Sequence, residues 1–350
     1  MSEPAARLDR STVGPSRSGR VLLFLKAHPI LCLALLTPGI PEYLSTSSSL
    51  LTLVTSPPFF FLQLGINVGQ YTAGALLIRE AALRWKKGWA SVFVLGLAYG
   101  IVEEGLGDNT LFNSNHGADG VLGSFGRFGG VNWVWATGVL AFHVIYSVGL
   151  PLLLLGLALP ETRGRSLLGD RGIALALLSL TLATSLETTI VFGVFHYWMG
   201  PTLLVGATVT VILLLAVAYK LPKDLLSAKT ERPSLGTFEA WAVGFAFFPI
   251  AFFLEYGFTG RPIPPSAIIL VELLAFGALL ERIRRRVGQR SNEYLLVHLA
   301  FGFIAWQAVF GFLLTLGLPY TLMLDPFVVW FFLRLRRAYA PRGTESTRVI

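Results

Sequence analysis

The feature that most constrains this chain is its series of apolar runs, each about as long as a helix that crosses a bilayer. A spanning helix needs about 20 mostly apolar residues, and 54% of these 350 residues are hydrophobic while 14% are charged. We therefore expect an all-α, multi-pass protein of the cell membrane, in contact with the lipid bilayer. Hydropathy predicts ten spans: 21–40, 57–78, 89–107, 132–159, 173–198, 201–220, 237–257, 265–281, 294–315 and 317–338.

The basic residues predict the orientation of these spans. The net charge of +8 would suggest nucleic acid in a soluble protein, but here we expect no nucleic-acid partner, because the charges follow the membrane topology. Of the 28 lysines and arginines, 25 fall in the N-terminal segment, in or beside four alternate connections, and in the C-terminal stretch from Arg334 onward. Cytoplasmic loops carry an excess of such residues, so both termini are predicted to be cytoplasmic.

The chain is expected to divide into three parts. Residues 1–20 form a polar, basic and disordered segment, residues 21–338 form the helical domain, and residues 339–350 form a basic tail. The single cysteine, Cys32, lies inside an apolar run. It excludes an intrachain disulfide and a cysteine-based metal site.

Two adjacent acids, Glu103 and Glu104, stand near the end of the predicted third span. A carboxylate at membrane depth costs several kcal/mol unless it is paired, protonated or facing a wet cavity, so such a pair indicates a functional site. At about 1.5 Å per residue, the pair lies roughly 20 Å above the cytoplasmic end of its helix, and His143 lies about 16 Å below the outer end of the next. Consecutive antiparallel spans are usually neighbours. We therefore expect the two acids and this imidazole to face one cavity.

The helix geometry sets a condition on that arrangement. Successive side chains diverge by about 100° on a regular α-helix. Both acids reach one cavity only if Gly105 and Gly107 allow the helix end to distort, or if one acid faces a neighbouring helix. Pro151 is expected to loosen the next span near Ser147, one turn from His143.

The longest outer connection, residues 108–131, has glycine at every third position from Gly117 to Gly129. Two interpretations stay open. It is either a mobile loop or a lid over the acid pair, with Asn113, Asn115 and His116 at its neck.

The motifs EEGLGDN, VLAFH and HYWMG contain Glu103-Glu104, His143 and His196, separated by 39 and then 53 residues. This order resembles the CAAX-protease and bacteriocin-processing (CPBP) family of intramembrane proteases, whose motifs are EExxxR, FxxxH and HxxxN or HxxxD. The chain departs from them at Asp108, Val139 and Gly200.

The resemblance implies peptide hydrolysis by an activated water, on a membrane-anchored peptide, or a non-catalytic relative of such an enzyme. Glu104 would act as the general base, Glu103 and His143 would orient the water, and His196 would support the oxyanion. Glu104, His143 and His196 are also a donor set that a divalent metal such as Zn²⁺ accepts, although the chain has no HExxH spacing.

Transport is the alternative function. Four further acids lie within or near the outer halves of other predicted spans, and Asp325 directly precedes a proline. Such an acidic interior could coordinate a cation or relay protons in a cation-coupled or proton-coupled transporter. The acids of this route are Glu187, Glu255, Glu272 and Asp325.

Overall fold

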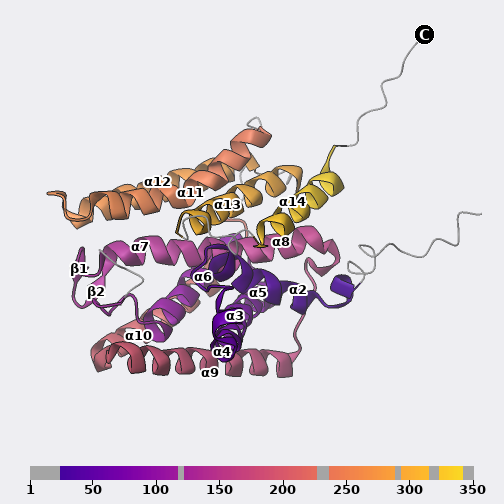
Figure 1. Cartoon of the computed structure of the whole chain (residues 1–350). Helices are drawn as coiled ribbons and strands as arrows, with labels where there is room; N and C mark the ends of the chain where they lie inside the picture. Colours follow the sequence, from indigo (N-terminus) through magenta and orange to yellow (C-terminus); the bar gives the residue numbers. More distant parts are fainter. Residues whose placement is uncertain (1–23, 117–121, 227–235, 288–292, 315–322, 342–350) are drawn as a thin grey trace, which may run out of the picture.

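The computed structural model describes residues 24–116, 122–226, 236–287, 293–314 and 323–341. These residues are almost entirely helical, as the composition predicts, with one short antiparallel hairpin (Figure 1). The predicted disordered segment 1–20 and most of the predicted basic tail, residues 342–350, lie outside them. The labelled elements are α2 (Pro29–Pro38), α3 (Thr52–Thr55), α4 (Pro57–Asn67), α5 (Ala73–Arg84), α6 (Trp89–Gly100), β1 (Arg127–Phe128), β2 (Val131–Asn132), α7 (Trp133–Phe142), α8 (Leu150–Ala158), α9 (Asp170–Phe195), α10 (Gly200–Lys220), α11 (Thr237–Phe258), α12 (Pro265–Val287), α13 (Glu293–Leu314) and α14 (Asp325–Tyr339).

Six helices of the described chain are long and apolar enough to cross a membrane, and each corresponds to one of the ten predicted spans. They are Trp89–Gly107, Trp133–Ala158, Asp170–Phe195, Gly200–Lys220, Thr237–Phe258 and Glu293–Leu314. The predicted first span is a shorter apolar helix, Pro29–Leu44. The last predicted span is represented by the 15-residue α14, and residues 317–322 of that span lie outside the described chain.

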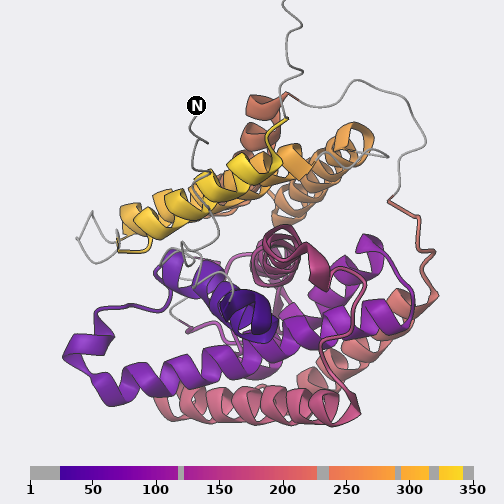
Figure 2. The ribbon, with the colours of Figure 1, turned by 90° about the vertical axis from the view of Figure 1, so that its right-hand side faces the viewer.

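The helices form layers around the long helix that contains α7 and α8. The C-terminal helices α11 to α14 lie on one side of it, and α9 lies on the opposite side (Figures 1 and 2). The largest apolar cluster joins α8, α11 and α13 and includes Tyr146, Leu154 and Phe303. In contrast, α9 and α10 expose most of their leucine and valine side chains. Helices with such apolar outer surfaces are suited to contact with lipid.

Four of the described helices contain a π-helical segment. These segments are Gly39–Leu44, Val68–Thr72, Ile101–Gly107 and His143–Gly149. A π-helix closes its hydrogen bonds from i to i+5, so it makes a wider turn than an α-helix, and such segments occur frequently at functional sites. All four lie within or at the end of helices that are otherwise regular, so they are candidate markers of a functional site.

Glycines of α6 bring that helix into close contact with the π-helical segment His143–Gly149. A Cβ atom at Gly96 would lie 3.1 Å from Cα of Val144, and one at Gly100 would lie 3.2 Å from Cβ of His143. Small residues four apart allow helices in membranes to approach closely. The contact sets the end of the helix Trp89–Gly107 directly against His143.

Candidate functional site

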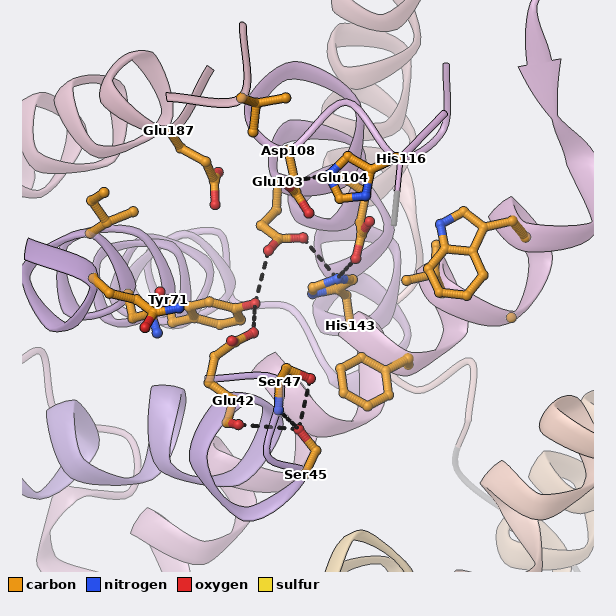
Figure 3. Close-up of a pocket in the computed structure, with 18 of the residues that line it drawn as sticks. Glu42, Ser45, Ser47, Tyr71, Glu103, Glu104, Asp108, His116, His143 and Glu187 are labelled. Atoms are coloured by element: carbon orange, nitrogen blue, oxygen red, sulfur yellow. Dashed lines mark hydrogen bonds and ion pairs between the residues drawn. The ribbon is translucent and has the colours of Figure 1, made fainter. Parts of the chain in front are cut away.

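The two adjacent acids and His143 meet inside the helical bundle. Nε2 of His143 lies 2.8 Å from Oε1 of Glu104 and 2.9 Å from Oε2 of Glu103 (Figure 3). The imidazole is 1% exposed, and the two glutamates are 6% and 8% exposed. A single ring nitrogen therefore faces two buried carboxyl groups.

The π-helical segment Ile101–Gly107 explains how both acids reach one imidazole. Its wider turn reduces the angle between successive side chains below the value for an α-helix. The segment includes Gly105 and Gly107, where the sequence argument requires a distortion, and the amide of Asp108 donates to the carbonyl of Glu103. The two side chains consequently point to the same wall of the bundle.

A hydrogen bond on its other ring nitrogen orients the imidazole. Nδ1 of His143 lies 3.0 Å from Oγ of Ser147. The segment His143–Gly149 is π-helical and directly precedes α8, whose second residue is Pro151, as expected for a helix that proline loosens near Ser147. The contact with Ser147 leaves Nε2 for the carboxylates.

The outer connection folds back onto the acid pair. The hydroxyl of Thr110 donates to Oε2 of Glu104, and Nε1 of Trp135 donates to Thr110 over 3.0 Å. Arg127, in the strand β1 of the hairpin, donates to the carbonyl of Phe112 over 2.7 Å. This bond holds the hairpin against the part of the connection that contains Thr110. The described part of this connection is thus a packed cap beside the site, while its residues 117–121 lie outside the described chain.

A further carboxyl group joins the site through a tyrosine. The hydroxyl of Tyr71 lies 2.8 Å from Oε1 of Glu103 and 2.6 Å from Oε1 of Glu42 (Figure 3). Oγ of Ser48 donates to the other oxygen of Glu42 over 2.7 Å. Because a phenol carries one proton, it can donate to only one of two carboxylates at a time. The second contact becomes a hydrogen bond when one of the two carboxyl groups is protonated.

These groups line a cavity of about 690 Å³. Its polar wall includes Glu42, Glu103, Glu104 and His143, and Asp108 pairs there with His116 at 3.1 Å. The rest of the cavity wall is mostly apolar and is formed by aliphatic and aromatic side chains of α4, α7, α11 and α13. Those lining residues include Phe59, Leu62, Val139, Phe142, Phe248, Phe252, Phe310 and Leu314.

The structure does not bring His196 into this group. The helix α9 ends at Phe195, and His196 then takes a left-handed conformation with φ of 52° and an exposed side chain. It is absent from the described lining of the cavity. The expectation that His196 joins the acid pair is therefore wrong, because the chain turns out of the helix before this side chain can face the bundle.

The four acids of the alternative transport route do not all lie together. Glu187 and Glu255 line the same cavity, and Nε2 of Gln70 donates to Glu187 over 2.9 Å. Glu272 is completely buried. Asp325 borders a separate hollow with residues of its own helix, α14. The described residues therefore form no single route through all four acids.

Two residues of the site, Glu42 and Tyr71, are not predicted from the sequence. Glu42 follows the end of the predicted first span, so hydropathy places it at an interface rather than inside a site. Tyr71 lies inside the predicted span 57–78 and resembles an ordinary packed aromatic. Their shared signal is the polar content of two otherwise apolar segments, but sequence alone does not show that these segments meet.

The comparisons with known proteins give a family and nothing more specific. A family model described as "Uncharacterized membrane protein family" matches residues 31–334. The chain belongs to this family. No curated protein and no solved structure matches the chain. Family membership agrees with the apolar helices and establishes a membrane protein.

In this member of the family, Glu103, Glu104 and His143 are also able to hold a metal ion. Each offers one ligand atom, and these atoms all lie within 4.8 Å of one another. Oε2 of Glu103 makes no hydrogen bond, and the Nδ1 contact with Ser147 orients the imidazole as in many metal sites. One imidazole and two carboxylates fit Zn²⁺. The expected ligand set keeps Glu104 and His143 and exchanges His196 for Glu103.

Proposed function

We propose that this protein is an intramembrane peptidase similar to the CPBP family, acting on a membrane-anchored peptide. The observation that carries the proposal is the meeting of Glu103, Glu104 and His143 at the wall of one cavity. An imidazole and two carboxyl groups are the side chains that general acid–base hydrolysis uses.

The contacts of the two acids differ, and this difference suggests a separate role for each. Both oxygens of Glu104 are engaged, one by His143 and the other by Thr110. Oε2 of Glu103 has no hydrogen bond and lies 2.9 Å from the imidazole. We therefore assign the general base to Glu103, whereas the family resemblance implies that it is Glu104. In this mechanism Glu104 orients the imidazole.

The proposed reaction conserves its protons. Glu103 takes a proton from water while the water oxygen bonds to the scissile carbonyl carbon, and the same proton then passes to the leaving amine as the C–N bond breaks. His116 is the other described imidazole that lines the cavity, so it replaces His196 as the candidate for supporting the oxyanion. Where a divalent metal is bound, Glu103, Glu104 and His143 would hold it, and it would supply Lewis-acid activation of the water.

A second candidate function is proton-coupled or cation-coupled transport. The observation that favours it is the chain of contacts from Glu42 through Tyr71 and Glu103 to His143. Such a chain can hand a proton from group to group, and acidic groups inside membranes frequently serve as proton relays. A non-catalytic relative of the peptidases would keep this chain without cleaving peptides.

Reconstitution in liposomes separates these functions. The purified protein is assayed for cleavage of membrane-anchored peptides and, in the same preparation, for proton and cation flux. We expect cleavage that is lost in Glu103→Gln, Glu104→Gln and His143→Ala but retained in the control His196→Ala. Flux without cleavage would replace the peptidase with the transporter. Equal loss of folded protein in the glutamate and His143 variants would assign these residues to packing.

We also propose that the chain crosses the cell membrane ten times with both termini in the cytoplasm. The clustering of 25 of its 28 basic residues in alternate segments supports this topology. Single cysteines placed near residues 10 and 345 of a Cys32→Ser chain test it. A thiol reagent that cannot cross the membrane should label neither cysteine in intact cells, and labelling of either would refute the orientation.

A further inference from the structure

We propose that the cavity binds an amphipathic organic cation, with its charge among the acids and its apolar body against the aromatic wall. This inference concerns binding alone, so it holds or fails separately from the peptidase proposal. If the cavity is also a peptidase site, the preferred peptide would carry a lysine or arginine within an apolar segment.

The first support is the one-sided charge of the cavity. None of the described residues that line it is a lysine or an arginine, whereas six are acids: Glu42, Glu103, Glu104, Asp108, Glu187 and Glu255. Two histidines, His116 and His143, complete the titratable lining apart from two tyrosines. Carboxylates in a low-dielectric environment are costly unless they are protonated or paired with a cation. A bound cation would stabilise the ionised form of the acids nearest to it.

The second support is the presence of two buried carboxylate oxygens that make no hydrogen bond in the described structure. Oε2 of Glu103, whose side chain is 6% exposed, makes no hydrogen bond, although it lies 2.9 Å from Nε2 of His143. Oε1 of Glu255 also makes no hydrogen bond, and its side chain is 4% exposed. They come from different helices, the first from Ile101–Gly107 and the second from α11, and both line the cavity. Buried polar groups almost always have a partner. These two oxygens are the sites at which we place the cationic group.

The third support is the remaining wall, which determines the kind of cation. Phe142 on α7, Phe248 and Phe252 on α11, and Phe310 on α13 all line the cavity. The rings of Phe248 and Phe310 lie 5.8 Å apart, and those of Phe252 and Phe310 lie 5.3 Å apart. Aromatic faces attract cations, and they also bury apolar groups. A hydrated inorganic ion would leave this wall unused.

The size of the cavity agrees with such a ligand. Its volume of about 690 Å³ falls within the roughly 300–1,000 Å³ of typical small-molecule sites. Sites of this kind combine mostly apolar walls with a few polar groups that fix orientation. Oε1 of Glu255 and Oε2 of Glu103 provide such groups here.

Tetraphenylphosphonium and tetraphenylborate test the proposal, because they share one shape and carry opposite charges. Binding is measured by equilibrium dialysis to the full chain in nanodiscs, with empty nanodiscs subtracted. We expect saturable binding of tetraphenylphosphonium with no saturable binding of tetraphenylborate. Protein-dependent binding of the anion as tight as that of the cation, or no saturable binding of the cation, would overturn the proposal.

Variants locate the site. Glu255→Gln and Glu103→Gln should each weaken binding of tetraphenylphosphonium on the order of tenfold. The control is Glu239→Gln at the start of α11, because Glu239 pairs with Arg282 and does not line the cavity. Unchanged binding in both cavity variants would refute this site even if the wild-type chain binds the cation. Thermal unfolding of each variant establishes that it is folded.

Discussion

Replacing Tyr71 by phenylalanine tests the hydrogen-bonded chain at its centre. The substitution keeps the ring, which is 2% exposed and packs among buried residues, and removes only the hydroxyl between Glu42 and Glu103. Tyr99 provides a matched control. Its ring is also buried, lies 5.9 Å from that of Tyr71, and carries a hydroxyl with no hydrogen-bond partner.

The expected magnitude follows from these contacts. A hydrogen bond to a charged group contributes about 1.5–3 kcal/mol to stability, and a buried group left without its partner costs a similar amount. The phenol has one proton, so only one of its two contacts is a donated bond, and the loss should lie near 2 kcal/mol rather than twice that. Tyr99→Phe removes an unbonded hydroxyl, so we expect it to leave the free energy of unfolding nearly unchanged or to raise it.

The free energies are measured by reversible unfolding in mixed micelles with increasing dodecyl sulfate. Glu42→Gln and the double variant with Tyr71→Phe complete a double-mutant cycle, which should give a coupling energy of at least about 0.5 kcal/mol for residues in one network. Equal changes in the free energy of unfolding for Tyr71→Phe and Tyr99→Phe, or a coupling energy of zero, would refute the hydrogen-bonded link that Tyr71 makes between Glu42 and Glu103.

Two further predictions concern one helix contact beside the site and one buried ion pair away from it. Gly100→Leu should destabilise the fold by about 1–3 kcal/mol, because a Cβ atom there would already lie 3.2 Å from that of His143. Thermal unfolding is compared with that of Gly65→Leu, a control at a position with open space around it. Equal melting temperatures of the two variants would contradict the close packing at Gly100. Glu80→Ala should cost about 3–5 kcal/mol, because this 1% exposed carboxylate lies 2.9 Å from Nη1 of Arg79 and accepts from the amide of Leu167 over 2.8 Å; a melting temperature within a degree of wild type would show that the pair does not stabilise the fold.

The sequence predicts the helical class, because apolar runs of this length have few other structures open to them. It also predicts that Glu103, Glu104 and His143 lie together, since two antiparallel neighbours and the depth of each residue determine that meeting. His196 fails for a local reason, as α9 ends one residue before it. Periodicity cannot foresee where a helix ends when no strong capping residue marks the place.

Glu42 and Tyr71 are missed for a different reason. Their roles depend on contacts between helices that are distant in sequence, since 29 residues separate them and 32 separate Tyr71 from Glu103. A hydropathy profile gives each helix an axis but not its rotation about that axis. The π-helical segments add to the difficulty, because they shift the side chains that follow them away from the positions a regular helix would give.

Those segments also bear on how sequences of this family can diverge. A π-helical segment holds one residue more than an α-helix of the same path, so deleting one residue from it restores a regular helix. Deletion of Val102 would leave a continuous α-helix, while Glu103 and Glu104 would rotate by about 100° about the helix axis relative to the preceding turns. A relative shortened by one residue at this point would thus retain the architecture and lose the contact between the acids and the imidazole, so chain length there would indicate whether a relative keeps the site.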